Sequence, residues 1–292
     1  MNIRKSLFIL LTPILLCCSG CSMISLGYNH ADFLLRYWIN DYTSFNDAQK
    51  EQISFDVDEY LRWHRKEALP GYIALLQSVD KAVNRPGGLT DSDVVRLKAE
   101  SARLYRLTMT PMIKPAAHIL STLDNTQITE LADTLAERNR KQRKKQLDGS
   151  EKDMLDARAE RHVELVAKLV GYLSLAQEKK ITEMSLHIPF ASRAFIEQRE
   201  TKQARLIALL RDKAGEDQIA AFLWQWLIAP ETFRTPQQQQ IIAAYEDAMG
   251  DMTIQIAASL TTRQKQHLSD EIASYIDDFS KLNLATEESP SR

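Results

Sequence analysis

The 292-residue sequence has few of the residues that covalent cross-links and special backbone positions need. Its three cysteines stand at positions 17, 18 and 21, so no disulfide can join two segments of the chain beyond position 21. Nine glycines leave little for tight β-hairpins or phosphate-binding loops, which favours a helix-rich chain. The formal net charge of −2 lacks the basic excess typical of nucleic-acid-binding proteins. We therefore expect a helical protein without disulfides that does not bind nucleic acid.

The first twenty residues have the pattern of an export signal. Arg4 and Lys5 precede an apolar run over residues 7–16. Because a hydrocarbon core needs about 20 apolar residues, a permanent membrane-spanning helix is the weaker interpretation of this run. We predict that residues 1–20 are a signal peptide; an ordinary cleaved signal without lipid, or an uncleaved anchor, is the alternative.

The apolar run ends in Cys17-Cys18-Ser19-Gly20-Cys21, which resembles the lipobox of bacterial lipoproteins. In such proteins the cysteine thiol is diacylated, the signal is cut before that cysteine, and the new amine is acylated. The resemblance implies that Cys21 is lipidated and becomes the first mature residue, although Cys18 departs from the preferred aliphatic residue. In such lipoproteins an aspartate directly after the lipidated cysteine retains the protein in the inner membrane. Ser22 stands at that position here, so the resemblance implies sorting to the outer membrane, on the side that faces the periplasm.

Apolar residues recur at helical spacing through the rest of the chain. Ile53, Val57, Tyr60, Leu61 and His64 lie at offsets of 0, 4, 7, 8 and 11, which places them on one face of a helix. No comparable stretch alternates with the period of two that a half-buried strand requires. We predict an all-α fold, a multi-helix bundle of about eight to eleven helices.

Two breaks divide the helical pattern. They are the segment 84–88 and Asp148-Gly149-Ser150, and the second is the better candidate for a boundary between two packed subdomains. Pro111 and Pro115 should kink or split the helical stretch that contains them. The expected parts of the mature protein are a lipidated N-terminus and short tether at 21–29, an all-helical periplasmic domain at 30–284 and a disordered tail at 285–292.

Six segments share the chemistry of a capped helix start. In each, a Ser, Thr, Asp or Asn stands three positions before a Gln or Asp. The first side chain can accept a hydrogen bond from an early helical N–H, while the second accepts from the N–H of the capping residue. The six segments are Phe45–Gln49, Leu89–Asp93, Leu123–Gln127, Leu173–Gln177, Thr235–Gln238 and Leu260–Gln264.

The start Leu260-Thr261-Thr262-Arg263-Gln264 resembles the LTxxQ motif of small periplasmic stress chaperones of the Spy and CpxP kind. Those proteins are all-helical cradles for unfolded or envelope-stress clients, and this chain is about twice their length. The resemblance implies a chaperone-like role. Helix capping without further function is the other interpretation, since the six starts are spaced too irregularly for a solenoid repeat.

A second resemblance covers nearly the whole mature chain. The lipobox Cys21, Tyr28-Asn29, the aromatic segment 33–42 with Trp38, and the start at Phe45–Gln49 are similar to a family of proteobacterial lipoproteins without assigned function. Because that family has no assigned activity, the resemblance implies no catalytic residues.

Patterns for catalysis or metal binding are scarce. The six histidines form no His-x-x-x-His or His-Glu-x-x-His pair, and neither a Gly-x-Ser-x-Gly elbow nor a phosphate loop occurs. We predict no catalytic site, no metal site and no cofactor beyond the covalent lipid on Cys21. A cell-wall or lipid-modifying enzyme with an unrecognised site is the contrasting hypothesis.

The first candidate binding feature is a basic run over residues 138–145, which includes Arg140, Arg143 and Lys144. An acid-rich run follows at 151–156. In a helical hairpin about Gly149 the two runs would neutralise each other. Alternatively the basic run forms a protruding tip that binds anionic headgroups, lipopolysaccharide phosphates or an acidic protein.

The second candidate is the aromatic segment with Phe33, Tyr37 and Trp38, which begins 12 residues after Cys21. Trp38 and the tryptophans at 63, 224 and 226 are expected to be core residues. If they instead line a surface, they would bind exposed apolar segments of other proteins.

These observations predict a lipid-anchored, periplasm-facing protein of the outer membrane that is not an enzyme. Its acyl chains would contact the membrane, and a chaperone-like or scaffolding role in binding envelope proteins is the leading hypothesis. An adaptor or regulator of an envelope assembly is the alternative.

Overall fold

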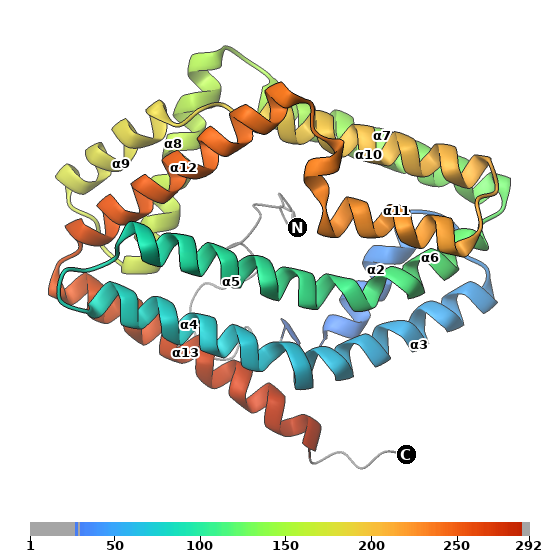
Figure 1. Ribbon diagram of the computed structural model, residues 1–292, viewed down its shortest axis with the longest axis horizontal. Coiled ribbons are helices and arrows are strands. Elements are labelled where there is room, and N and C mark those ends of the chain that lie inside the picture. Colours follow the sequence, from blue (N-terminus) through green and yellow to red (C-terminus); the bar gives the residue numbers. More distant parts are fainter. Residues whose placement is uncertain (1–26, 29, 288–292) are drawn as a thin grey trace.

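The computed structural model describes residues 27, 28 and 30–287, and these form helices joined by short loops, with no strand among them (Figure 1). The all-α, multi-helix prediction is confirmed. Twelve α-helical segments are present in this part of the chain. Two pairs of them are continuous, since α3 passes into α4 through a π-helix and α5 into α6 through a 3-10 turn.

The first half of the structure runs from residue 30 to 147. Its elements are α2 (Ala31–Asn40), α3 (Asp47–Trp63), η1 (His64–Ala68), α4 (Leu69–Asn84), α5 (Asp91–Met109), η2 (Thr110–Met112), α6 (Ile113–Ser121) and α7 (Asn125–Leu147). The predicted break at 84–88 and the split at Pro111 are both confirmed.

The second half runs from residue 151 to 287. Its elements are α8 (Glu151–Val170), α9 (Leu175–His187), α10 (Ser192–Arg211), α11 (Glu216–Ile228), η3 (Pro230–Phe233), α12 (Pro236–Ser259) and α13 (Thr262–Glu287). The turn at 148–150 separates the halves. Helix α13 continues to Glu287, into the segment expected to be a tail, and residues 288–292 lie outside the described residues.

Each of the six predicted helix starts is capped as expected. At α3, for example, Asn46 Oδ1 accepts from the backbone N–H of Gln49 at 2.9 Å, and Gln49 Oε1 accepts from that of Asn46 at 2.9 Å. A further box at Ser150 and Asp153 opens α8. Each such cap contributes about 1 kcal/mol to helix stability.

Four of these glutamines also join distant helix starts, and they do so identically in the two halves. In the first half, Gln49 Nε2 donates to Gln127 Oε1 at 3.2 Å and Gln127 Nε2 donates back to Gln49 Oε1 at 2.7 Å. The same amides donate to backbone carbonyls, Gln49 to Thr122 at 3.2 Å and Gln127 to Ser44 at 2.8 Å. The start of α3 is thereby fastened to the start of α7.

In the second half, Gln177 and Gln264 make the corresponding reciprocal pair, at 2.9 and 3.0 Å. Gln177 donates to the carbonyl of Ser259 at 3.0 Å and Gln264 to that of Tyr172 at 2.7 Å. The four acceptor carbonyls occupy equivalent positions. An apolar residue precedes each capping residue, and the acceptor is the carbonyl of the residue before that apolar residue. This agreement identifies α8–α13 as a repeat of α2–α7.

Packing between helices follows the same correspondence. Helix α7 lies along α10 of the other half, and α13 lies along α4. In the repeat, α5 corresponds to α11 and α6 to α12. Helix α11 packs on α6, and in the equivalent contact α5 packs on α12. Helices α5 and α11 also contact each other. In Figure 1 a half-turn in the plane of the picture brings the α4–α13 pair at lower left onto the α10–α7 pair at upper right. The halves are therefore related by an approximate two-fold axis, and each contributes its last helix to the other.

Two main cores lie within this arrangement. The first collects buried apolar residues of α3, α6, α7 and α11, whereas the second is built from α8, α9, α10 and α12. Helix α10 contributes to both cores. Ala194, near its start, belongs to the second core, whereas Leu206 and Leu210, near its end, belong to the first. Ile196, also near its start, is buried.

Candidate functional site

Helix α2 presents the densest group of exposed apolar side chains in the described part of the chain. Phe33, Leu34, Tyr37 and Trp38 are 63, 45, 66 and 37% exposed, and we call these four residues the α2 strip. The rings of Phe33 and Tyr37 stack with their centroids 6.3 Å apart. No residue of α2 itself is fully buried.

The opposite face of α2 holds the helix on the first core. Ala31, Leu35 and Ile39 pack against that core, and Arg36 forms an ion pair with Asp58 of α3. Because the charged side chain is tied to α3, the outer face remains apolar. Trp38 lies at the margin of the first core rather than within it, because it is 37% exposed and its ring packs edge-on against Tyr42 with the centroids 5.2 Å apart. Trp224 is also exposed, whereas Trp226 packs against the first core.

The segment that leads into α2 is fixed to the π-helix η1. The Tyr28 hydroxyl and His64 Nδ1 lie 2.6 Å apart, and the Arg65 guanidinium lies over the Tyr28 ring at 5.3 Å. Burial lowers the pKa of His64 to about 4 and raises that of Tyr28 to about 12. At neutral pH the imidazole and the phenol are therefore both uncharged, and the tautomer of the imidazole decides which of the two donates in this bond.

Sequence reasoning missed this junction, although it placed His64 on the apolar face of a helix. A π-helix inserts one extra residue per turn, and such insertions are frequent at functional sites. Here the insertion forms where α3 joins α4, and Tyr72 of α4 bonds Thr108 at 2.7 Å beside it. The junction fixes where the N-terminal segment meets the folded domain.

The basic run does not pair with the acid-rich run as a hairpin would require. Helix α7 lies along α10 while α8 lies along α9, so the two helices diverge at Gly149, whose φ is 96°. Arg143 forms a two-point ion pair with Glu200 of α10, at 2.7 and 2.5 Å. Arg138 bonds Asp41 at 2.7 Å and lies 3.9 Å from the Tyr42 ring centroid.

Arg140 pairs with Glu137 one turn earlier, and Lys144 is exposed. Of the three predicted binding residues in the basic run, Arg143 is thus held by its ion pair with α10, while Arg140 and Lys144 are exposed at the surface. The structure brings none of the three into the α2 strip. Only Arg138 reaches the end of α2, through Asp41.

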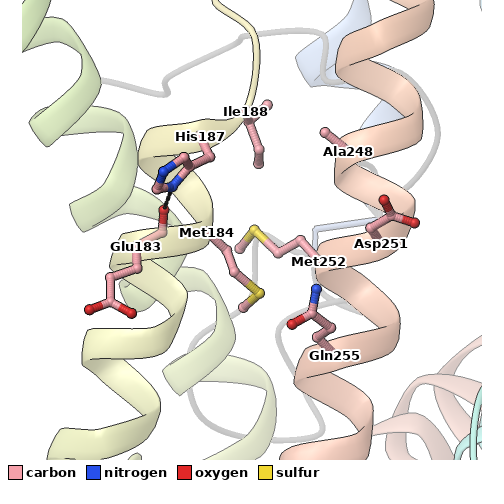
Figure 2. A pocket seen from close by; sticks show the side chains of 8 residues that line it. All are labelled: Glu183, Met184, His187, Ile188, Ala248, Asp251, Met252 and Gln255. Carbon is pink, nitrogen blue, oxygen red and sulfur yellow. Dashed lines mark hydrogen bonds between the residues drawn. The ribbon is translucent and has the colours of Figure 1, made fainter.

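A pocket of about 260 Å³ lies between α9 and α12 (Figure 2). The thioethers of Met184 and Met252 occupy its middle, and the carboxylates of Glu183 and Asp251 stand on opposite sides. His187 Nδ1 bonds the carbonyl of Glu183 at 2.7 Å within its own helix. This lining does not bring two carboxylates together for acid–base chemistry.

Among the described residues, no group of three or more His, Cys, Asp and Glu side chains is arranged to hold a metal ion. The helices of this part of the chain also include none with the length and apolar composition that crossing a bilayer requires. The predicted lipidation site Cys21 and sorting residue Ser22 lie outside the described residues, so both stay predictions.

Comparison with known proteins yields one match. The model of a family of unknown function, DUF6279, matches residues 41–239, which include α3 through α11 and both the Gln49–Gln127 pair and Gln177. Neither the curated proteins nor the solved structures contain a match to the chain.

Proposed function

The chain belongs to the DUF6279 family, whose function is unknown, and we propose that it is a lipid-anchored envelope protein that binds other proteins without catalysing a reaction. In this proposal Cys21 carries the acyl chains, Ser22 permits the outer membrane, and the helical domain faces the periplasm. Nucleic acid is not among its partners, because export removes the protein from the cytoplasm and its net charge is −2.

The internal repeat is the observation that carries the protein-binding role. The sequence resembles LTxxQ chaperones of about half its length, and each half of the structure contains two glutamine-capped starts joined by a reciprocal amide pair. One half is therefore about as long as one such chaperone, although only the start at Leu260–Gln264 has the LTxxQ residues and the other starts share its capping chemistry. Two such units in one chain support a chaperone-like cradle.

Exposed apolar side chains on α5 and α11 offer a surface for clients. Val95 of α5 and Trp224 of α11 are both exposed, and these two helices contact each other where the halves meet. A protein segment that exposes apolar residues would bury such side chains on binding.

Photo-crosslinking in living cells tests this proposal. The test positions for the crosslinker are Val95, Trp224, Arg140 and Lys144, and the control position is Lys179 on α9. Each is compared in the lipoprotein and in a Cys21→Ala form exported by an ordinary signal. Many unrelated envelope proteins captured at Val95 and Trp224 would support a chaperone-like role, and one dominant protein would indicate an adaptor. Capture of no protein at these positions would refute the protein-binding role.

A further inference from the structure

The α2 strip is only partly matched in the second half of the molecule. The repeat aligns Phe45 with Leu173, and this register places Ala31, Leu35 and Ile39, which face the first core, opposite Ala159, Val163 and Ala167. Val163 and Ala167 pack against the second core, and Ala159 is buried. The same register places Leu34 opposite His162 and Trp38 opposite Val166.

In the second half these two positions lie inside the protein. His162 is 7% exposed and Val166 is 9% exposed. His162 Nδ1 bonds Ser185 Oγ at 2.8 Å, and Val166 belongs to the second core. At these two positions the first half exposes side chains that the second half buries. At the other two, the first half has the aromatic rings of Phe33 and Tyr37, whereas the second half has Arg161 and Leu165, and Leu165 is 38% exposed.

The position of the strip along the chain relates it to the membrane. Tyr28 stands seven positions after Cys21, so the chain between them spans at most about 25 Å even when fully extended. Tyr28 is bonded to His64, and α2 begins three residues later. Of the two halves, only the one nearest to the predicted lipid anchor carries the strip.

The chemistry of the strip fits the surface of a bilayer. Trp and Tyr side chains concentrate at membrane–water interfaces because each combines an apolar ring with a polar group, while Phe and Leu partition into the acyl boundary. Arg36 and Asp32 form an ion pair at 3.6 Å, and Arg36 also pairs with Asp58, so these charges are compensated on the protein.

We propose that the α2 strip lies in the interface of the membrane that holds the Cys21 lipid and sets the orientation of the domain on that membrane. This inference rests on the lipid anchor of the proposed function but not on its protein-binding role. The acyl chains on Cys21 already hold the protein on the membrane, so a second apolar contact would fix the orientation of the domain rather than its attachment. The strip is that second contact.

A site-specific fluorophore tests the inference on the lipoprotein itself. The mature chain has no cysteine after Cys21, whose thiol is a thioether once lipidated, so Tyr37→Cys or Lys179→Cys gives one reactive thiol. Each labelled protein is inserted in vesicles of phosphatidylethanolamine and phosphatidylglycerol, with or without brominated acyl chains. Brominated lipid should quench the label at position 37 and leave that at position 179, an exposed site on α9, unchanged.

A variant of the strip provides the matched comparison. Phe33→Ser with Leu34→Ser should reduce the quenching at position 37 without lowering the melting temperature, because both side chains are exposed. Equal quenching at positions 37 and 179, or none at 37, would overturn the inference. It would also be overturned by a label at 37 that is already shielded in the soluble Cys21→Ala form, which would show that protein covers the strip.

The mass of the N-terminal peptide separates this failure from that of the proposed function. An unacylated Cys21 refutes the anchor, and with it both proposals. An acylated Cys21 with no quenching at position 37 refutes only the inference about α2, and protein capture at Val95 and Trp224 is unaffected by either result.

Discussion

The two halves of this protein share their helix starts and differ in what they do with their first helix. In both, glutamines at the third helical position form a reciprocal amide pair that fastens two distant starts. In the second half, α8 has 20 residues and buries polar and apolar side chains, including Arg158 and His162. In the first, α2 has ten residues and exposes an aromatic face. The repeated features maintain the fold, whereas the features found in one half are the candidates for function.

The halves also differ in the fifth of their six helices. Thr110-Pro111 precedes the nine-residue α6, whereas Thr235 caps the 24-residue α12, which begins at Pro236. The second helix differs as well, because α3 continues through the π-helix into α4 while α9 ends at His187 before a loop. The first half therefore keeps one long bent rod, on which Tyr28 is fixed, where the second half has two separate helices.

The largest expected effects come from the two cores. Ile128→Ala in the first core and Ile242→Ala in the second should each reduce the free energy of unfolding by about 3 to 5 kcal/mol, because both side chains are buried and each change leaves a cavity. Since α7 packs on α10 and α13 on α4, both variants should lower one shared transition. Calorimetry that resolves two transitions, with one variant affecting only one of them, would show that the two halves unfold independently despite the exchange of α7 and α13.

The next largest effect is expected at the amide pairs. Gln127→Leu and Gln264→Leu should each cost about 2 to 4 kcal/mol, because the partner glutamine, a backbone carbonyl and the cap N–H lose their hydrogen bonds. Urea denaturation of the two variants measures this cost. A large loss for one variant and none for the other would show that the pairs are not equivalent.

Acid should weaken the second half through His162. Burial lowers the pKa of this side chain to about 4, helped by the positive charge of Arg158, so between pH 6.5 and 4 the unfolded chain binds more protons than the folded one. Stability should therefore fall as the pH drops through this range, by about 2 to 3 kcal/mol for this residue. His162→Asn should flatten the dependence of the unfolding midpoint on pH. An unchanged slope would contradict the assignment.

The smallest effect separates the equivalent positions of α2 and α8. Val166→Ala should cost about 2 kcal/mol because the side chain is buried, whereas Trp38→Ala should cost about 1 kcal/mol because its ring is partly exposed and its main ring contact is with Tyr42. Thermal melting of the two variants under the same conditions measures the difference. A cost of about 3 to 5 kcal/mol for Trp38→Ala would restore the core interpretation of this tryptophan.

Local chemistry made much of the fold predictable. The spacing of Ile53, Val57 and Leu61 predicted one buried helical face, and all three side chains are buried. Pro111 predicted the break after α5, and each predicted cap is formed. Such features depend on residues a few positions apart, so the sequence reveals them directly. The exposure of the α2 strip was not predicted, because periodicity identifies an apolar helix face without indicating what covers that face.

The sequence by itself determined that the chain is helical and where its helices start, because capping, proline geometry and apolar periodicity act over a few residues. Only the tertiary structure decided that Gln49 meets Gln127 and Gln177 meets Gln264, that α7 and α13 are exchanged between the halves, and that Tyr28 is held by His64. Those contacts join residues between 36 and 189 positions apart. Their partners are selected by the packing of whole helices, which no short segment of sequence specifies.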